Sequence, residues 1–249
     1  MRIAIIADTH GNFLALDTVL AEIERDGIEQ IVCLGDISGL GPQPRETLAR
    51  LRMLGCPVVM GNADEFMLDP SLLAPERHPA ADDMLRRMHE MERWCASQLG
   101  PADRDYIRTF QPTIEIALGS SQSQSLLCYH GSPRSSWDEI RASTPDGELA
   151  EKLGERRTLV MAGGHTHEQF VRRLDQSIVI NPGSVGLSYE TFRQGGHRNP
   201  PWAEYATLTV EGGRLDVNLR RVAVDQEAIR QVLLDSGMPH AAWWAADRR

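Results

Sequence analysis

Apolar and polar positions alternate along the first part of the chain in a way that predicts strands followed by helices. Residues 3–7 form a continuous apolar run, which is typical of a central strand covered on both faces. The apolar positions within residues 13–23 recur at helical spacing, and Asn12 precedes them as a predicted helix N-cap. Residues 31–34 and 57–60 are two further short apolar runs. This alternation predicts an α/β protein.

The middle of the chain, residues 64–110, changes to a charged and helix-rich pattern. Its methionine-rich apolar stripe has nearly helical spacing. An amphipathic helix over a sheet edge is a more ordinary interpretation of such a stripe than a cofactor site. We therefore predict that residues 64–110 form a helical insert beside a functional site.

After Pro112 the pattern becomes typical of short strands and hairpins. Turns are predicted at residues 175–176 and 211–213, between alternating runs. Trp243 and Trp244 predict a helical end. The sequence shows no fixed-period repeat and no convincing linker, so residues 1–249 are predicted to form a single domain. The predicted strands are residues 114–118, 125–129, 158–162, 170–174, 177–180, 205–210 and 214–219.

Composition restricts the partners of this chain. The formal net charge of -9 provides no basic surface for duplex nucleic acid, so tight nucleic-acid binding is not expected. A metal site would bring its own positive charge and allow a small phosphorylated substrate to bind. The widely spaced cysteines favour free thiols in a reducing compartment. No apolar run approaches the roughly 18 residues of a membrane span, so we expect a cytoplasmic protein without membrane contact, whose oligomeric state stays open.

Seven side chains with metal-ligating chemistry stand at the ends of apolar runs, where open α/β sheets place their ligand sites. Two aspartates, one asparagine and four histidines offer oxygen and nitrogen atoms, enough for two divalent ions that share one carboxylate. Each motif alone is equally typical of a helix cap, a turn or a core histidine, so the prediction depends on the whole set. The predicted ligands are Asp8, His10, Asp36, Asn62, His130, His165 and His167.

In chain order these motifs read D-x-H, GD, GN, H and GHxH, and with them the chain resembles the calcineurin-like metallophosphoesterases from Arg2 to about Val210. Residues 35–42 and 181–186 are similar to stretches of the family's small bacterial and archaeal phosphodiesterase-like branch. Asp36 is the expected bridge, since its two oxygens can reach both ions. The resemblance implies that one ion takes Asp8, His10, Asp36 and His167, and the other Asp36, Asn62, His130 and His165.

The resemblance implies a four-layer α/β sandwich, in which two mixed β-sheets are flanked by helices and residues 64–110 form a small helical cap. It also implies a phosphodiesterase that hydrolyses a small organic phosphate or nucleotide by attack of a metal-bound hydroxide. Alternatives are a phosphomonoesterase, a dinucleoside polyphosphate hydrolase and a metal-binding scaffold without catalysis. Ligand chemistry leaves the two divalent ions open among Mn, Fe, Zn and Ni.

The chain departs from the family pattern at the group that protonates the leaving oxygen. Many members carry histidine directly after GN, but this chain has Ala63, which cannot transfer a proton. Such a loss favours substrates with a good leaving group. Asp64 is a candidate substitute acid, although a helix cap at the surface is its more ordinary interpretation.

Candidate substrate contacts come from two asparagines and one arginine. Asn12 and Asn62 are expected to hold the phosphate, together with backbone donors. Arg198, or alternatively Arg193, could bind a phosphoryl oxygen in the bidentate manner of arginine, although an ordinary exposed loop is the simpler interpretation of their segment. The histidines within residues 64–110, His78 and His89, are assigned to solvent.

Overall fold

The fold is built on two mixed β-sheets, which the computed structural model describes over residues 1–74, 82–120, 124–192 and 196–246. The strands are β1 Arg2–Ile6, β2 Gln30–Cys33, β3 Ile114–Ala117, β4 Ser125–Cys128, β5 Val160–Ala162, β6 Phe170–Leu174, β7 Ser177–Asn181, β8 Glu190–Thr191, β9 His197–Arg198, β10 Trp202–Glu211 and β11 Arg214–Ala223. The first sheet has the order β11-β10-β1-β2, in which β1 and β2 run parallel. The second has the order β3-β4-β5-β7-β6, in which β4, β5 and β7 run parallel. A small third sheet pairs β8 with β9.

Helices cover the outer faces of this pair of sheets. The first helix begins as the sequence predicted, because the Asn12 side chain accepts a hydrogen bond from the backbone N–H of Ala15. Among the described residues, no helix combines the length and the apolar composition that crossing a bilayer requires. The helices are α1 Phe13–Arg25, α2 Pro44–Leu54, α3 Asn62–Leu68, the 3₁₀ helix Pro70–Leu73, α4 Asp83–Gln98, α5 Pro101–Ile107, α6 Asp146–Leu153, α7 Gln226–Asp235 and α8 Ala241–Ala245.

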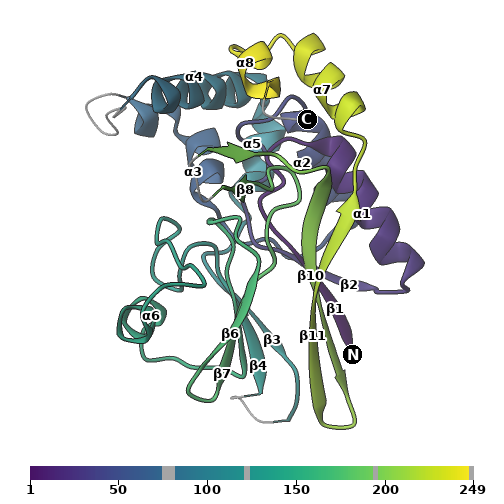
Figure 1. Cartoon of the computed structure of the whole chain (residues 1–249), viewed down its shortest axis with the longest axis vertical. Coiled ribbons are helices and arrows are strands. Elements are labelled where there is room, and N and C mark those ends of the chain that lie inside the picture. Colours follow the sequence, from purple (N-terminus) through teal and green to yellow (C-terminus); the bar gives the residue numbers. More distant parts are fainter. Residues whose placement is uncertain (75–81, 121–123, 193–195, 247–249) are drawn as a thin grey trace.

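Strand β1 shows how the layers form, because its alternate side chains enter different cores. Ala4 and Ile6 pack with the helices on one side. Ile3 and Ile5 face the second sheet and pack with residues such as Leu126. A third core lies between the far face of the second sheet and α6. The resulting order of helices, sheet, sheet and helix confirms the predicted four-layer sandwich (Figure 1).

One predicted strand is absent from the described fold. Residues 57–60 touch their neighbours through single bridges, from Val58 to Cys33 and from Val59 to Gln111. The chain leaves the sheet at once because α3 begins at Asn62. The apolar run therefore marks a buried segment that is too short to form a ladder.

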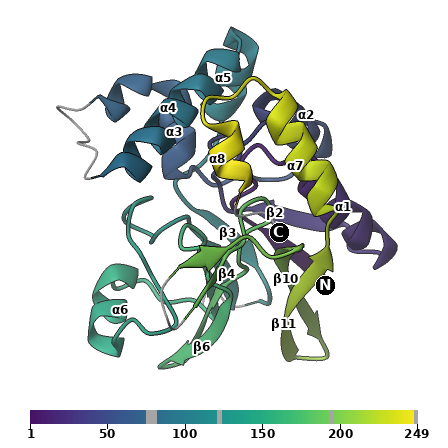
Figure 2. The same cartoon turned by 45° about the horizontal axis from the view of Figure 1, so that its top comes forward.

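Residues 64–110 are helical through most of their described length, and α4 lies beside α3 and α8 at one end of the molecule (Figure 2). The C-terminal α8 packs beside α4. The Arg87 guanidinium lies 5.1 Å from the centre of the Trp243 ring, and His240 Nε2 lies 2.6 Å from Glu90 Oε2. The predicted helical end at Trp243 and Trp244 thus covers α4, while the description of residues 64–110 as an insert stays a prediction.

Candidate metal centre

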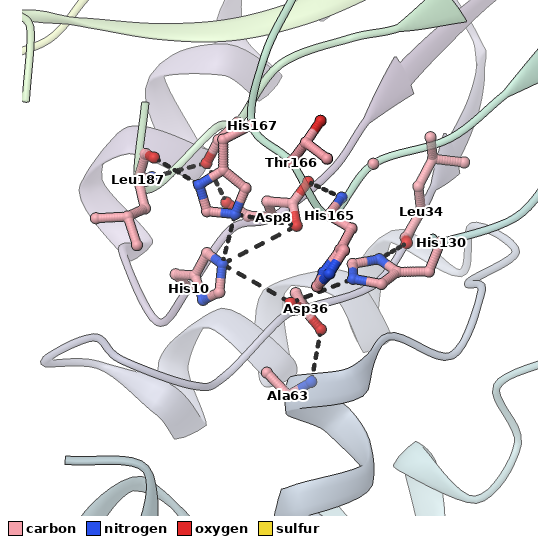
Figure 3. Close-up of polar contacts among 12 residues, drawn as sticks. Asp8, His10, Leu34, Asp36, Ala63, His130, His165, Thr166, His167 and Leu187 are labelled. Carbon is pink, nitrogen blue, oxygen red and sulfur yellow. Dashed lines mark hydrogen bonds and ion pairs between the residues drawn. The ribbon is translucent and has the colours of Figure 1, made fainter. Parts of the chain in front are cut away.

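The predicted ligands converge at the carboxyl ends of the parallel strands. Asp8 and His10 follow β1, Asp36 follows β2, His130 follows β4, and the double-histidine motif follows β5. Parallel strands end at the same edge of a sheet, and the two sheets pack face to face, so motifs far apart in sequence meet there (Figure 3).

A first cluster contains Asp8, His10 and His167, all of them buried. His167 Nε2 lies 3.3 Å from Asp8 Oδ1, and His10 Nε2 lies 4.0 Å from the same oxygen. The two Nε2 atoms are 3.0 Å apart. One oxygen and two nitrogens therefore surround a single point.

A second cluster contains Asp36, His130 and His165. His130 Nε2 lies 3.3 Å from Asp36 Oδ2 and 3.1 Å from Asn62 Oδ1. The clusters are joined in two ways. Asp36 Oδ2 is also 3.9 Å from His10 Nε2, and the backbone N–H of His165 donates to Asp8 Oδ2 at 3.2 Å. Asp36 therefore lies between the clusters.

Three imidazoles are anchored through their Nδ1 atoms. Those of His10, His130 and His167 donate to the backbone carbonyls of Gly39, Leu34 and Leu187, at 3.1, 2.7 and 2.8 Å. A neutral imidazole that donates through Nδ1 presents a lone pair at Nε2, and such second-shell bonds orient metal ligands.

This geometry fits a divalent cation. When both rings are neutral, the Nε2 lone pairs of His10 and His167 face each other at 3.0 Å and repel one another; Asp8 Oδ1 is buried without a hydrogen-bond partner among the described residues. A cation between these three atoms would satisfy all of them. Oxygen and imidazole ligands without a thiolate suit Mn, Fe, Zn and Ni alike.

The backbone that carries these ligands is strained. Asp8, His10, Asp36, His165 and His167 all have φ between 43° and 66°. Left-handed conformations are uncommon for residues with a Cβ, and they cluster at functional sites where the surrounding fold enforces them. Five ligands in this conformation indicate a centre whose geometry is fixed by the main chain.

Electrostatics favour ionised carboxylates in this buried site. Burial opposes ionisation, but His167 holds the pKa of Asp8 below its usual value, and His130 does the same for the pKa of Asp36. Burial lowers the pKa of His10 to about 4, with His167 acting in the same direction. Burial also acts to lower the pKa of His130, but Asp36 raises it to about 10. A divalent cation would replace the proton on His130.

Asp64 does not occupy the position of a substitute acid. It is fully buried, and its two carboxylate oxygens accept hydrogen bonds from the backbone N–H groups of Asp36, Ile37 and Gly61. It is absent from the described residues that line the cavity above the ligands. Asp64 is a helix cap, as its ordinary interpretation held, but an interior one that ties the Asp36 loop to α3.

Two of the predicted substrate contacts also lie elsewhere. The Asn12 side chain caps α1 and donates to the Gly186 carbonyl at 3.0 Å, so both ends of its amide are engaged. Arg198 pairs with Glu190 at 2.8 Å and is absent from the described cavity lining. Arg193 lies outside the described residues. Asn62 alone among the three candidates lines the cavity.

A cavity of about 420 Å³ opens above the ligands. Its walls hold residues that the sequence did not single out as functional. His89, assigned to solvent from the sequence, is only 6% exposed and lines the cavity. Helical spacing on α4 indicated a buried face, but not that this face meets the metal ligands. The walls include Phe66, Met88, His89, Glu92, Trp137, Arg141, Tyr189 and Trp244.

Comparisons with known proteins agree with this geometry. Residues 1–213 match the model of the calcineurin-like phosphoesterase superfamily domain. The chain is 48% identical, over 201 residues, to an uncharacterised protein of Methanocaldococcus jannaschii, an alignment that covers 74% of this chain and 76% of that protein. The chain has the same fold as two solved structures of low sequence identity.

A metallophosphoesterase of Sphaerobacter thermophilus has a TM-score of 0.76 at 24% identity, with 100% of both chains covered. A hypothetical protein of Pyrococcus horikoshii OT3 has a TM-score of 0.75 at 21% identity, over 96% of this chain and 94% of that one. The extent of the family match decides the assignment, and the ordered ligand motifs agree with it. This chain belongs to the calcineurin-like phosphoesterase superfamily.

Proposed function

We propose that this chain is a phosphodiesterase that uses two divalent ions to hydrolyse a small organic phosphate or a nucleotide. The observation that carries the proposal is the position of Asp36, whose Oδ2 lies 3.9 Å from His10 Nε2 and 3.3 Å from His130 Nε2. One carboxylate thus faces both ligand clusters. Two ions that share a carboxylate are typical of enzymes that hydrolyse phosphate esters.

The two clusters support a pair of ligand sets that share Asp36. Asp8, His10 and His167 would hold one ion, and His130, His165 and Asn62 the other, with Asp36 common to both. Bound ions lower the pKa of water and neutralise charge on the phosphoryl oxygens. The protein supplies fixed ligand orientation, through the Nδ1 anchors, and a neutral oxygen at Asn62.

Arg141 is the side chain that we propose for binding the phosphate. It lines the cavity, and its Nη1 lies 3.5 Å from the Tyr189 hydroxyl. Glu139 holds the same guanidinium at 3.0 Å. Arginine binds phosphoryl oxygens in bidentate fashion, and Arg141 lines the same cavity as the predicted metal ligands His10, Asp36 and His165.

The size of the cavity and the net charge of the chain favour a small substrate. Cavities of about 300–1,000 Å³ typically hold small molecules, and this one is of about 420 Å³. The net charge of -9 disfavours a long polyanion.

We further propose Mn²⁺ as the activating ion. We propose the cytoplasm as the location, because all four cysteines are free thiols.

The test compares bis-p-nitrophenyl phosphate with p-nitrophenyl phosphate, using metal-stripped protein with and without added Mn²⁺. We expect faster turnover of the diester, which requires the metal and is lost in His165→Ala. The matched control is His240→Gln, which changes a histidine outside the ligand set and leaves an amide to bond Glu90. Faster turnover of the monoester would instead favour a phosphomonoesterase. Two bound ions without turnover of either substrate would favour a scaffold.

A further inference from the structure

A buried carboxyl group on α4 has no evident structural purpose. Glu92 is only 4% exposed, and its Oε2 has no hydrogen-bond partner within the part of the chain that the structure describes. Burying such a polar atom without a partner is costly. A buried polar group without a partner is a candidate for function.

Glu92 lies beside the metal centre. It lines the same cavity as His10, Asp36 and Asn62. Its carboxyl fills the space where Gly39 lacks a side chain, since a Cβ on that glycine would meet Glu92 Oε2. The Gly39 carbonyl in turn accepts the Nδ1 bond of His10 at 3.1 Å. One backbone segment thus separates the Glu92 carboxyl from a ligand.

The surroundings of Glu92 favour its protonated form. Burial raises its pKa well above the ordinary value of 4.5, and the charges of Asp36 and Asp64 act in the same direction. A protonated carboxyl group is a hydrogen-bond donor and an acid. Ala63, which occupies the position where many family members carry the acid histidine, lines the same cavity.

We infer that Glu92 donates a proton to the leaving oxygen, in the role that Ala63 cannot fill; this inference rests on the proposed phosphodiesterase function. The attacking water gives its OH group to phosphorus and releases one proton. The bond from phosphorus to the leaving oxygen breaks with its electron pair on that oxygen, which takes the proton of Glu92. The proton released by the water restores the carboxyl group, so atoms and charge balance.

His89 is the competing donor on the same helix. It stands three residues before Glu92, on the same face of α4, and also lines the cavity. Glu92 is the better candidate because its unpartnered oxygen lies against the loop that supports His10. A variant of each residue separates the two assignments.

The experiment measures kcat across a series of methyl aryl phosphates, from p-nitrophenyl to unsubstituted phenyl, with Mn²⁺-loaded protein. A good leaving group departs without a proton, whereas a poor one needs the acid. The kcat of Glu92→Gln is therefore expected to fall by about 10²-fold for the phenyl ester and to stay nearly unchanged for the p-nitrophenyl ester. Glu90→Gln, on α4 but outside the described cavity lining, is the matched control and should follow wild type on both esters.

A second variant keeps the test independent of folding. Glu92→Asp retains an acid, so it should recover the wild-type dependence on the leaving group, whereas a purely structural role predicts equal loss on all esters in both variants. Equal loss, or a selective loss in His89→Asn with none in Glu92→Gln, would overturn the assignment. A wild-type protein inactive on every ester would instead refute the phosphodiesterase proposal, and the inference with it, before any variant is compared.

Discussion

The floor and the wall of the cavity are built on different principles. We define the floor as the six charged or imidazole side chains of the two clusters, in the loops after β1, β2, β4 and β5. The wall is the rest of the cavity lining, which includes residues of α3, α4, α8 and residues 137–141. The floor is fixed by the main chain, with five ligands in left-handed conformations and three rings bonded to carbonyls. The wall is made of side chains on helices and a loop. The difference teaches that the metal-ligating positions depend on the main chain, whereas the wall positions depend on side chains of separate elements and can be changed without disturbing the clusters.

The strongest test of the floor is Asp36→Asn. Mutating a residue that only orients a metal ligand typically lowers metal affinity or activity by about 10–100-fold. Asp36 is proposed as a direct ligand of both ions, so its loss should lower diester turnover by more than about 100-fold. Metal content, measured on the same sample by elemental analysis, should fall from two ions per chain. Full activity in this variant would contradict the shared-carboxylate centre.

A glycine tests whether the main chain fixes the floor. A Cβ on Gly186 would lie 1.8 Å from the Thr9 carbonyl oxygen, between two ligands of the first cluster. Gly186→Ala should therefore lose about 1–3 kcal/mol of unfolding free energy, because a clash with backbone forces the loop to shift. The displaced ligands should also weaken metal affinity by about 10–100-fold. Denaturant unfolding and metal titration measure both effects.

The control for that glycine lies on α6. A Cβ at Gly147 would meet nothing within 4 Å, so Gly147→Ala should leave metal affinity unchanged. Equal behaviour of the two alanine variants would mean that close backbone approach does not set the floor.

In the wall, two variants test which arginine binds the phosphate. Arg141→Ala removes the residue proposed from the structure, and Arg198→Ala removes the one predicted from the sequence. A hydrogen bond to a charged group contributes about 1.5–3 kcal/mol, so loss of Arg141 should lower kcat/KM for a diester by about tenfold or more. Arg198 pairs with Glu190 outside the described cavity lining, and its loss should have little effect. The reverse ranking would return the phosphate contact to Arg198.

The smallest expected effect is the dependence of the unfolding free energy on pH, which buried Glu92 should produce. Because the folded pKa of Glu92 lies above its ordinary value of 4.5, the folded state holds this proton more tightly than the unfolded chain. Wild-type stability is therefore lost as pH rises from 4.5 toward the folded pKa, and Glu92→Gln escapes this loss. In thermal melts, the melting temperature of Glu92→Gln should rise relative to that of the wild type as pH increases. Each kcal/mol corresponds to about 2–4 °C for a chain of this size, so a rise of a few degrees is expected. A gap that does not change with pH would contradict a buried, protonated Glu92.

The sequence was most informative where local chemistry repeats a simple rule. The apolar run of β1 predicted a strand buried on both faces, and the structure has Ile3 and Ala4 in different cores. It was less informative where tertiary contacts decide. Residues 57–60 look like a strand but form single bridges, because α3 takes the chain away from the sheet. Asp64 looked like a surface residue but is buried.

By itself, the sequence determined the α/β layers and predicted seven metal-ligating side chains, six of which lie in the two clusters. Both follow from short-range patterns, since a strand end and the loop after it are adjacent in the chain. Only the tertiary structure decided what surrounds those ligands. Glu92 and Arg141 reach the cavity because α4 and the loop after β4 pack over the strand ends. No spacing rule encodes which face of a distant helix meets the site, because that depends on how separate layers pack.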